Sequence, residues 1–394
     1  MKAKLLIIAN NNIGTSQSGG DTIFLQFIKN WQKKLDITVI GSAESKRLIN
    51  RYRLKPKFIQ SDSINNNCYP TTLNIILHCF RRTFKAFKIF LKHKKIFKES
   101  EYCYTASDFI PDFIFGLLYK SVNPKGEWFC AQYLFAPSPS DKNTPYRTQP
   151  LKGFLYYFFQ KITKKLANKY ADIIFITSEP DKKYFPGKKV IVVQGGVDIT
   201  SSEKYLKSNK VKPVSSRQFD AVFIGRLHPQ KGVLELVDIW KIVVNKIPSA
   251  KLALIGDGQL KKDLESKIKE YKLNKNITLF GFRSGEKKYK IFKESKIVLH
   301  PAIYDSGGMA VAEAMAWGLP GVSFDLESLK TYYPEGMLKS PLNNYQHFAG
   351  NIIRLLKDKK LYNQISSEAL KLIRNKWDWS KRSQKIYNQI FYDK

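Results

Sequence analysis

Cysteine, histidine and acidic residues are scarce in this 394-residue sequence, which has four cysteines, five histidines and 33 Asp and Glu against 67 Lys and Arg. The cysteines, Cys68, Cys79, Cys103 and Cys130, all lie in the first half, and none form a C-x-x-C pair. This pattern favours neither a zinc site nor a disulfide framework. A reducing cytoplasm fits such a sequence.

Long apolar runs are also missing. After Met1-Lys2-Ala3-Lys4, the apolar run Leu5 to Ala9 is followed directly by three asparagines, which is too short for the hydrophobic region of a signal peptide. No segment reaches the ~18 consecutive apolar residues of a membrane-spanning helix. We therefore expect a cytoplasmic protein, either free or bound to the inner face of a membrane.

The basic excess gives a formal net charge of +34, which is either the compositional mark of an AT-biased genome or a functional surface. Eight cations and no acid lie between Arg81 and Lys98. On a helix, Phe80, Phe84, Phe87 and Leu91 form one stripe, with most of the cations beside it. We expect this helix to contact an anionic membrane surface.

A second aromatic and basic stretch runs from Phe154 to Lys165. Its apolar residues Leu155, Phe159, Ile162 and Leu166 follow ordinary helical spacing, which favours a core helix over a second membrane contact.

The segment Tyr304 to Pro320 sets two carboxylates, Asp305 and Glu313, eight positions apart with Gly307 and Gly308 between them. The glycines let the backbone approach a ligand closely, and the run from Met309 onward reads as a helix. The pattern indicates a loop feeding a helix whose N-terminal turn suits phosphate or hydroxyl groups. A solvated helix that begins after a glycine pair is the alternative.

The segment from Asp220 to Gly232 reads as a strand, a loop and the start of a helix. Arg226 and Lys231 lie in the loop, where Arg226 can hold phosphate oxygens bidentately and Lys231 adds a point charge. This arrangement predicts a diphosphate site at the carboxyl end of a parallel strand. The alternative is a pair of surface cations in a lysine-rich protein. His228 and His300 lie close enough in the sequence to these segments to be further candidates for donor contact.

Several pieces of the sequence, taken in order, resemble the retaining glycosyltransferases of family 4, which have the α/β fold GT-B: two Rossmann-like doubly wound domains facing across a cleft. The matching pieces are Gly225-Arg226-Leu227 with Lys231-Gly232, Ala250 to Gly258, Phe280-Gly281 and Asp305 to Pro320. The resemblance is strong from 221 to 320 and loose before that.

The resemblance implies that Arg226 and Lys231 hold the donor diphosphate, that Asp305 contacts the transferred sugar and that Glu313 binds the ribose. We take these four as catalytic candidates. Two departures from the family pattern concern Asp305, where glutamate is usual, and Gly307, where an aromatic residue is usual. The donor-binding candidates are Gly19, Gly20, Arg226, Lys231, Phe282, Gly307, Gly308, Met309 and Glu313.

The N-terminal half begins with a predicted strand at Lys4 to Ala9, a loop from Asn10 to Gly20 and a helix from Asp21 to Trp31. Gly19-Gly20 falls where family members carry a glycine pair near the transferred sugar or the acceptor. The segment Glu127 to Leu134 lacks the histidine that many relatives have there, so Gln132 or Tyr133 would supply its hydrogen bonds.

The polar stretch after Asp198 predicts a domain boundary. We expect an acceptor-side domain with the membrane-surface patch at residues 1–200, a linker at 201–216, a nucleotide-sugar-binding domain at 217–375, and a C-terminal helix at 376–394 that crosses back to the first domain.

The resemblance implies a glycosyltransferase that uses a nucleotide-sugar donor, UDP- or GDP-linked, and a glycan or polyprenyl-diphosphate-linked acceptor in cell-surface polysaccharide or glycoconjugate synthesis. It implies no cofactor and no metal, and the acids near the site do not form a closely spaced metal-binding pair. Three alternatives stay open: a noncatalytic GT-B partner subunit, a basic nucleic-acid-binding protein and a GT-B sugar-nucleotide epimerase.

Overall fold

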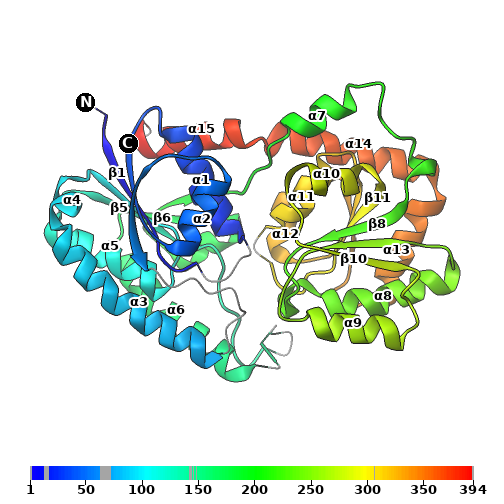
Figure 1. The fold of residues 1–394 in the computed structure, drawn as a ribbon, viewed down its shortest axis with the longest axis horizontal. Helices are drawn as coiled ribbons and strands as arrows, with labels where there is room; N and C mark the ends of the chain where they lie inside the picture. The colour runs from blue at the N-terminus through cyan, green and yellow to red at the C-terminus, as the bar shows by residue number, and fades with distance from the viewer. Residues whose placement is uncertain are drawn as a thin grey trace. The chain divides into compact units, whose positions relative to one another are not determined.

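The computed structural model describes residues 2–12, 17–62, 72–141, 144, 146–147, 149–305 and 307–392, so Cys68 and Ser306 lie outside the described residues. The chain divides into two compact units. The first is made of Met1–Gly195 with Ser380–Lys394, and the second of Gly196–Trp379. Each unit has a parallel sheet with helices against it (Figure 1).

Within its described residues, the first unit contains a seven-stranded parallel sheet in the order β3-β2-β1-β4-β5-β6-β7. The strand order reverses between β1 and β4, and in open parallel sheets ligands bind beside such a reversal, at the carboxyl ends of the strands. The strands are β1 (Lys4–Ala9), β2 (Asp36–Ser42), β3 (Lys57–Asp62), β4 (Tyr102–Thr105), β5 (Glu127–Ala131), β6 (Ile173–Ile176) and β7 (Lys189–Val192). The predicted strand at Lys4 to Ala9 is confirmed.

The helices of this unit are α1 (Gly19–Trp31), α2 (Ala43–Arg51), α3 (Thr72–Lys92), α4 (Lys94–Glu99), α5 (Ile110–Val122), α6 (Pro150–Tyr170) and α15 (Trp379–Phe391), with a 3₁₀ helix at Glu179–Tyr184. The prediction that the loop extends to Gly20 is wrong, because α1 begins at Gly19. Ser18 and Asp21 form a reciprocal capping box that starts the helix there.

The second unit, over the part of it that the structure describes, contains a six-stranded parallel sheet in the order β10-β9-β8-β11-β12-β13. Its order reverses between β8 and β11, so the predicted doubly wound fold is present in both units. The strands are β8 (Phe219–Ile224), β9 (Leu252–Ile255), β10 (Ile277–Gly281), β11 (Ser295–His300), β12 (Gly321–Phe324) and β13 (Met337–Ser340).

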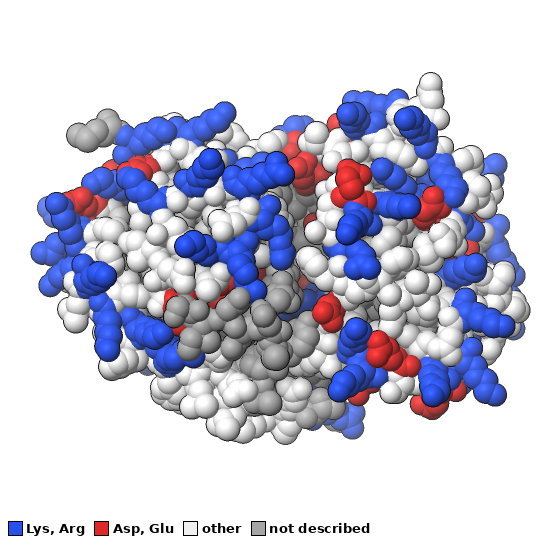
Figure 2. Space-filling view, viewed as in Figure 1, with Lys and Arg blue, Asp and Glu red and all other residues white. Residues whose placement is uncertain are grey.

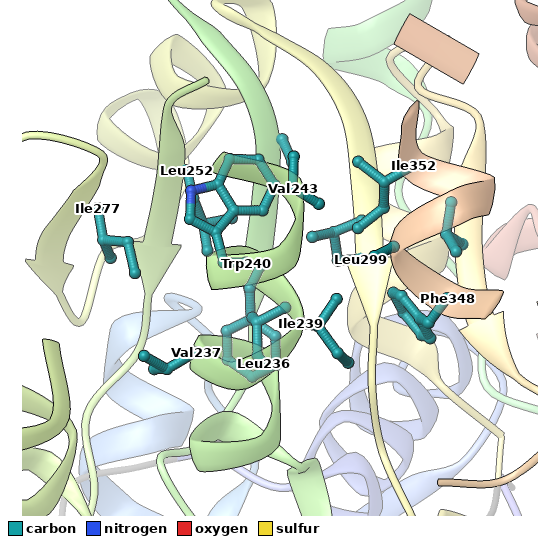
Figure 3. Packing of buried hydrophobic residues seen from close by; sticks show 14 of the residues in the cluster. Leu236, Val237, Ile239, Trp240, Val243, Leu252, Ile277, Leu299, Phe348 and Ile352 are labelled. Carbon is teal, nitrogen blue, oxygen red and sulfur yellow. The ribbon is translucent and has the colours of Figure 1, made fainter. Parts of the chain in front are cut away.

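The helices of the second unit are α7 (Thr200–Leu206), α8 (Val233–Lys246), α9 (Lys261–Glu270), α10 (Gly285–Lys293), α11 (Met309–Met315), α12 (Glu327–Tyr332), α13 (Tyr345–Lys357) and α14 (Lys359–Lys376), with 3₁₀ helices at Val214–Ser216 and Pro229–Lys231. Trp240 of α8 is fully buried among aliphatic side chains of the sheet and helices, including Val243 and Leu252 (Figure 3). Residues 201–216, predicted as a linker, belong to this unit and include most of α7.

Helix α15 packs on the first unit through aromatic rings. Trp31 of α1 stacks on Phe27 at 4.0 Å between ring centroids and meets Tyr387 and Phe391 of α15 edge-on at 5.8 and 6.0 Å. The Trp31 indole N–H also donates to the Ser383 carbonyl. Ile390, also on α15, is fully buried. The last helix therefore completes the core of the unit in which the chain begins.

We expect Ile390→Ala to lower the free energy of unfolding by about 2–4 kcal/mol, because the substitution removes a buried side chain and leaves a cavity. The measurement is a urea titration in which hydrogen exchange of peptides from α1 and α15 reports the unfolding of the first unit. Lys385→Ala, an exposed change on the same helix, is the control and shifts the midpoint little. Equal effects of the two substitutions would show that α15 does not stabilise the unit.

Two sequence predictions about surface helices are wrong. The continuous helix expected over Arg81 to Lys98 is interrupted at His93, between α3 and α4. Helix α6 was predicted to be core, but Phe159 is 37% exposed and Ile162 41% exposed, and the buried face carries Gly153, Gln160, Thr163 and Ala167 instead. Spacing defines a face of a helix but not which face the rest of the chain covers.

Helices α3 and α6 both pack against α5, and both expose large apolar side chains. These are Leu73, Leu77, Phe80, Phe84, Phe87 and Leu91 on α3, and Leu151, Phe154, Tyr157, Phe158, Phe159 and Ile162 on α6. We call them the apolar surface of α3 and α6. Across the described residues, no helix combines the length and hydropathy needed to span a bilayer.

Candidate functional site

The candidate site of the second unit lies at the ends of β8 and β11. These strands are paired in parallel, with Phe223 opposite Leu299, so the loops that follow them leave the same edge of the sheet. Arg226 and Lys231 follow β8, and Asp305 follows β11. The strand-order reversal thus brings together three of the four residues that the motifs predicted as catalytic.

Asp305 is held by two basic side chains and two backbone groups. Its Oδ2 lies 2.5 Å from Lys231 Nζ and 3.1 Å from His300 Nε2, and its Oδ1 accepts from the N–H groups of Gly307 and Gly308 at 3.3 Å. Its side chain is 8% exposed. The carboxylate therefore has a defined position at the base of the loop, directly before α11.

Burial by itself would raise the pKa of Asp305, but Lys231 and His300 hold that pKa well below its usual range. The carboxylate is therefore ionised at neutral pH and can accept hydrogen bonds from hydroxyl groups. Lys231 has three N–H donors, so its contact with Asp305 leaves others for an anionic ligand.

The loop between β8 and α8 fits against β11 because of Gly232. This residue has φ 64° and ψ 33°, and a Cβ atom there would overlap the carbonyl oxygen of Pro301. Only glycine combines that conformation with that approach. Gly308, at φ 59°, similarly faces His300 and Tyr333. Tyr333 donates a hydrogen bond to the Gly308 carbonyl at 2.7 Å.

The remaining predicted residues of this unit lie on neighbouring elements. Glu313 is on α11, where its Oε2 lies 2.6 Å from Lys288 Nζ of α10. Met309 begins α11, and the half-exposed Phe282 directly follows β10. Lys288 was not identified from the sequence as a partner of Glu313. The sequence offered only its position, as a lysine on the helix that precedes β11. Within the described residues, the Arg226 guanidinium has no hydrogen-bond or ion-pair partner.

We expect Gly232→Ala to lower the free energy of unfolding of the second unit by about 2 kcal/mol or more, since it imposes a left-handed conformation on alanine and a clash with Pro301. Gly350→Ala in α13 is the matched control, because nothing lies within contact distance of its added methyl group. Helix propensity predicts that the control is neutral or stabilising by up to about 1 kcal/mol. Urea unfolding curves of both variants test this, and a control as unstable as Gly232→Ala contradicts it.

Gly19 and Gly20 belong to the first unit and form the start of α1. A Cβ atom on Gly20 would lie 3.4 Å from the ring of Tyr133, which follows β5. The Tyr133 hydroxyl lies 2.7 Å from that of Tyr104, at the end of β4. Gln132 is instead buried, with its amide nitrogen on the Cys130 sulfur at 3.8 Å. Of the two candidates for the missing histidine, Tyr133 is the one beside the glycine pair.

The backbone that leaves β1 is hydrogen-bonded to Asp112 at Asn10 and Asn11. The N–H groups of both residues donate to Asp112 Oδ1, at 2.5 and 2.9 Å, and Ser107 donates to Asp112 Oδ2 at 2.5 Å. Burial raises the pKa of Asp112 to about 7, and these hydrogen bonds oppose the shift. Asp112 thus connects α5 to the loop that leads toward Gly19 and Gly20.

The raised pKa predicts a pH dependence of stability. The pKa of an aspartate in an unfolded chain is about 3.9. Between about pH 4 and 7 the folded state therefore binds more protons than the unfolded state. The free energy of unfolding therefore falls as pH rises through this window. We expect Asp112→Asn to make that decline shallower by up to ~1.4 kcal/mol per pH unit. The asparagine keeps the shape and the two bonds at Oδ1, while the Ser107 hydroxyl must turn to accept from the new amide group.

Urea unfolding at a series of pH values measures this decline. Asp263→Asn, on the surface of α9, controls for the loss of one negative charge from a basic chain. If both substitutions flatten the decline equally, the effect comes from net charge and not from the buried carboxyl.

Comparison with known proteins relates the chain to glycosyltransferases. Residues 206–372 match the model of the family described as glycosyl transferases group 1. The match lies within the second unit and contains the candidate site around Asp305. This chain is related to glycosyltransferases.

Two curated relatives show the extent of the similarity. The UDP-Gal:alpha-D-GlcNAc-diphosphoundecaprenol alpha-1,3-galactosyltransferase of Escherichia coli is 26% identical over 214 residues, which are 52% of this chain and 54% of that protein. The amylovoran biosynthesis glycosyltransferase AmsD of Erwinia amylovora is 30% identical over 163 residues, or 40% and 44% of the two chains. The chain spans about half the length of the curated relatives that it matches.

Solved structures extend the similarity to the whole fold. The crystal structure of Anabaena Alr3699/HepE in complex with UDP and glucose has a TM-score of 0.71 to this chain and covers 99% of it and 100% of its own chain, with 16% identity. This likeness confirms the predicted GT-B class, with two Rossmann-like units. In the described part of the chain, no group of three or more His, Cys, Asp or Glu side chains is placed to hold a metal ion.

Proposed function

We propose that this protein is a retaining glycosyltransferase that moves a sugar from a nucleotide-sugar donor to a glycan or lipid-linked acceptor, in cell-surface polysaccharide or glycoconjugate synthesis. The observation that carries the proposal is the meeting of Lys231 and Asp305 at the strand-order reversal of the second unit, with Arg226 in the same loop. The cations suit the diphosphate of a nucleotide sugar, and the carboxylate suits the hydroxyl groups of its sugar.

Each side chain then has one role. Arg226, whose guanidinium has no partner among the described residues, binds diphosphate oxygens bidentately, and Lys231 adds a second positive charge. Asp305 accepts hydrogen bonds from the transferred sugar, and Glu313 accepts them from the ribose. Gly307, Gly308 and Met309 carry the backbone that borders the sugar, and Phe282 lies beside the nucleoside.

The proposed reaction needs no protein nucleophile. The bond between the sugar C1 and the leaving phosphate oxygen breaks while the acceptor oxygen bonds to C1 on the same face. The acceptor hydroxyl proton passes to the leaving phosphate. Arg226 and Lys231 stabilise the charge that develops on the departing diphosphate, so the protein contributes positioning and electrostatics.

The names of similar proteins support the donor and acceptor classes. The Escherichia coli relative is named for a UDP-linked galactose donor and a diphosphoundecaprenol-linked acceptor, and the Anabaena structure holds UDP and glucose. These names support a UDP-linked donor and an acceptor on a polyprenyl diphosphate. A GDP-linked donor, a glycan acceptor and independence from metal ions are proposed from the resemblance in sequence alone.

The first test is thermal stabilisation by UDP, GDP and ADP. A nucleotide at about a hundred times its dissociation constant should stabilise the wild type by roughly 2.7 kcal/mol, and Arg226→Ala should abolish most of that shift. Arg354→Ala, on α13 away from the site, is the matched control and keeps the shift.

Other outcomes favour the alternatives. No shift with any nucleotide contradicts a donor site and points to a noncatalytic subunit. DNA binding that weakens steeply with salt indicates a nucleic-acid-binding protein. Release of free sugar from a UDP-sugar without any acceptor, with change of the sugar's configuration, indicates an epimerase.

We further propose that the protein works at the inner face of the membrane, bound peripherally to anionic lipid. The support is the apolar surface of α3 and α6, together with the exposed lysines of Arg81–Lys98, which are Lys88, Lys92, Lys94, Lys95 and Lys98. Arg81, Arg82 and Lys85 of the same run pair with the buried Asp62 instead. In Figure 2, lysines and arginines lie among uncharged side chains over the region of α3. Each cation near an anionic surface contributes about 1 kcal/mol, and the aromatic side chains can enter the headgroup region.

A further inference from the structure

Helix α3 combines an exposed apolar stripe with a buried arginine. Its exposed face carries leucine and phenylalanine, from Phe87 at 43% exposed to Leu91 at 69%. Its buried face carries His78 and Arg82 beside the core residues Ala86 and Phe90, and Arg82 is only 1% exposed. A helix that faced water alone would expose its charges and bury its phenylalanines. This helix therefore presents an apolar face outward and uses a buried charge inward.

The buried charge of Arg82 holds the loop that leaves β1. Its Nη1 donates to the carbonyl oxygens of Asn10 at 2.9 Å and Asn12 at 2.6 Å, and its Nη2 lies 2.9 Å from Glu44 of α2. Its Nε lies 3.4 Å from Asp62, at the end of β3. Asp112 accepts from N–H groups of the same loop, and Arg82 donates to its carbonyl oxygens. The two side chains together therefore hold both kinds of backbone group in this loop.

The same loop is also hydrogen-bonded to α1. The Asn12 side chain donates to Asp21 Oδ1 at 2.6 Å. Asp21 also accepts from the Ser18 N–H at 2.6 Å, in the capping box that starts α1 at Gly19 and Gly20. A run of hydrogen bonds therefore leads from α3, through Arg82 and Asn12, to the capping box that starts α1. The glycine pair in that first turn is the one predicted to lie near the transferred sugar or the acceptor.

We propose that contact of the exposed face of α3 with an anionic bilayer orders the loop at Asn10–Asn12 and the first turn of α1, through Arg82 as a positioning residue. The inference rests on the proposed membrane association. A bilayer is the occupant that fits, since the apolar stripe of α3 is continuous while cations lie along the same helix. A helix held by lipid moves less, and the groups bonded to its buried face then open less often.

Hydrogen exchange of the full chain tests the inference, with vesicles of phosphatidylcholine and with vesicles that also contain phosphatidylglycerol. We expect the anionic vesicles to slow exchange of the amides at residues 10–12 and 19–22 by at least about fivefold, the lower range of measured couplings between sites. Co-sedimentation with the same vesicles reports binding separately, and the nucleotide-induced thermal shift reports the second unit.

The decisive variant is Arg82→Lys, which keeps the charge but cannot bond two carbonyls and two carboxylates at once. We expect it to sediment with anionic vesicles as the wild type does and to lose the vesicle-induced protection. Arg81→Lys is the matched control, because Arg81 lies on the same helix and bonds to Asp62 at 2.6 Å, with no bond to the loop. This control keeps the protection.

If Arg82→Lys does not fold, Asn12→Ala carries the test, since Asn12 is only half-buried. It should keep protection at residues 10–12 and lose it at 19–22. Protection that persists in Arg82→Lys overturns the inference, and so does vesicle binding by the wild type without any change in exchange. Absence of vesicle binding overturns the membrane association and this inference together, and leaves the nucleotide shift as the test of the donor site.

Discussion

Parallel pairing of β8 with β11 is the constraint on which the candidate site depends. The two strands lie side by side in register, so the chain leaves both at the same edge of the sheet. Lys231 and Asp305, 74 positions apart, can then meet. The approach is close because Gly232 adopts a left-handed conformation against Pro301, where a side chain has no room. Arg226, the loop after β11 and α11 all take their places from this pairing.

Buried charge organises the sheet edge in both units. Asp305 is held by Lys231 and His300 in the second unit, and Asp62 by Arg81, Arg82 and Lys85 in the first. A buried carboxylate is unfavourable unless cations and donors surround it, so each cluster tolerates few arrangements of its loops. Such clusters contribute little net stability, but they define where the neighbouring backbone lies. That backbone is the part of each unit predicted to contact substrate.

The basic side chains of α3 lie in two different environments, some buried and some exposed. Arg82 is buried with two carboxylates, whereas Lys88 and Lys92 of the same helix remain exposed beside leucine and phenylalanine side chains. The apolar surface of α3 and α6 is therefore bordered by positive charge, and its inner side is bonded to the loop after β1. Attraction to an anionic surface and a loop positioned from that surface are the two properties that the proposed lipid-linked acceptor calls for.

The sequence by itself determined the fold class and most of the candidate donor residues. Apolar runs with β-branched residues marked β1 and β8, and the spacing of Asp305, Gly307, Gly308 and Glu313 marked the loop and helix after β11. These signals are local, because the spacing of apolar residues within a short segment predicts a strand or a helix.

Only the tertiary structure decided which partners these residues have and which faces are covered. It placed His300 against Asp305 and Lys288 against Glu313, buried Arg82 and exposed Phe159 and Ile162. Spacing predicts that a helix has an apolar face, but whether that face meets the core or solvent depends on elements far away in the chain. Ion pairs likewise form across sequence distances that no local pattern encodes, because the strand order brings their residues together.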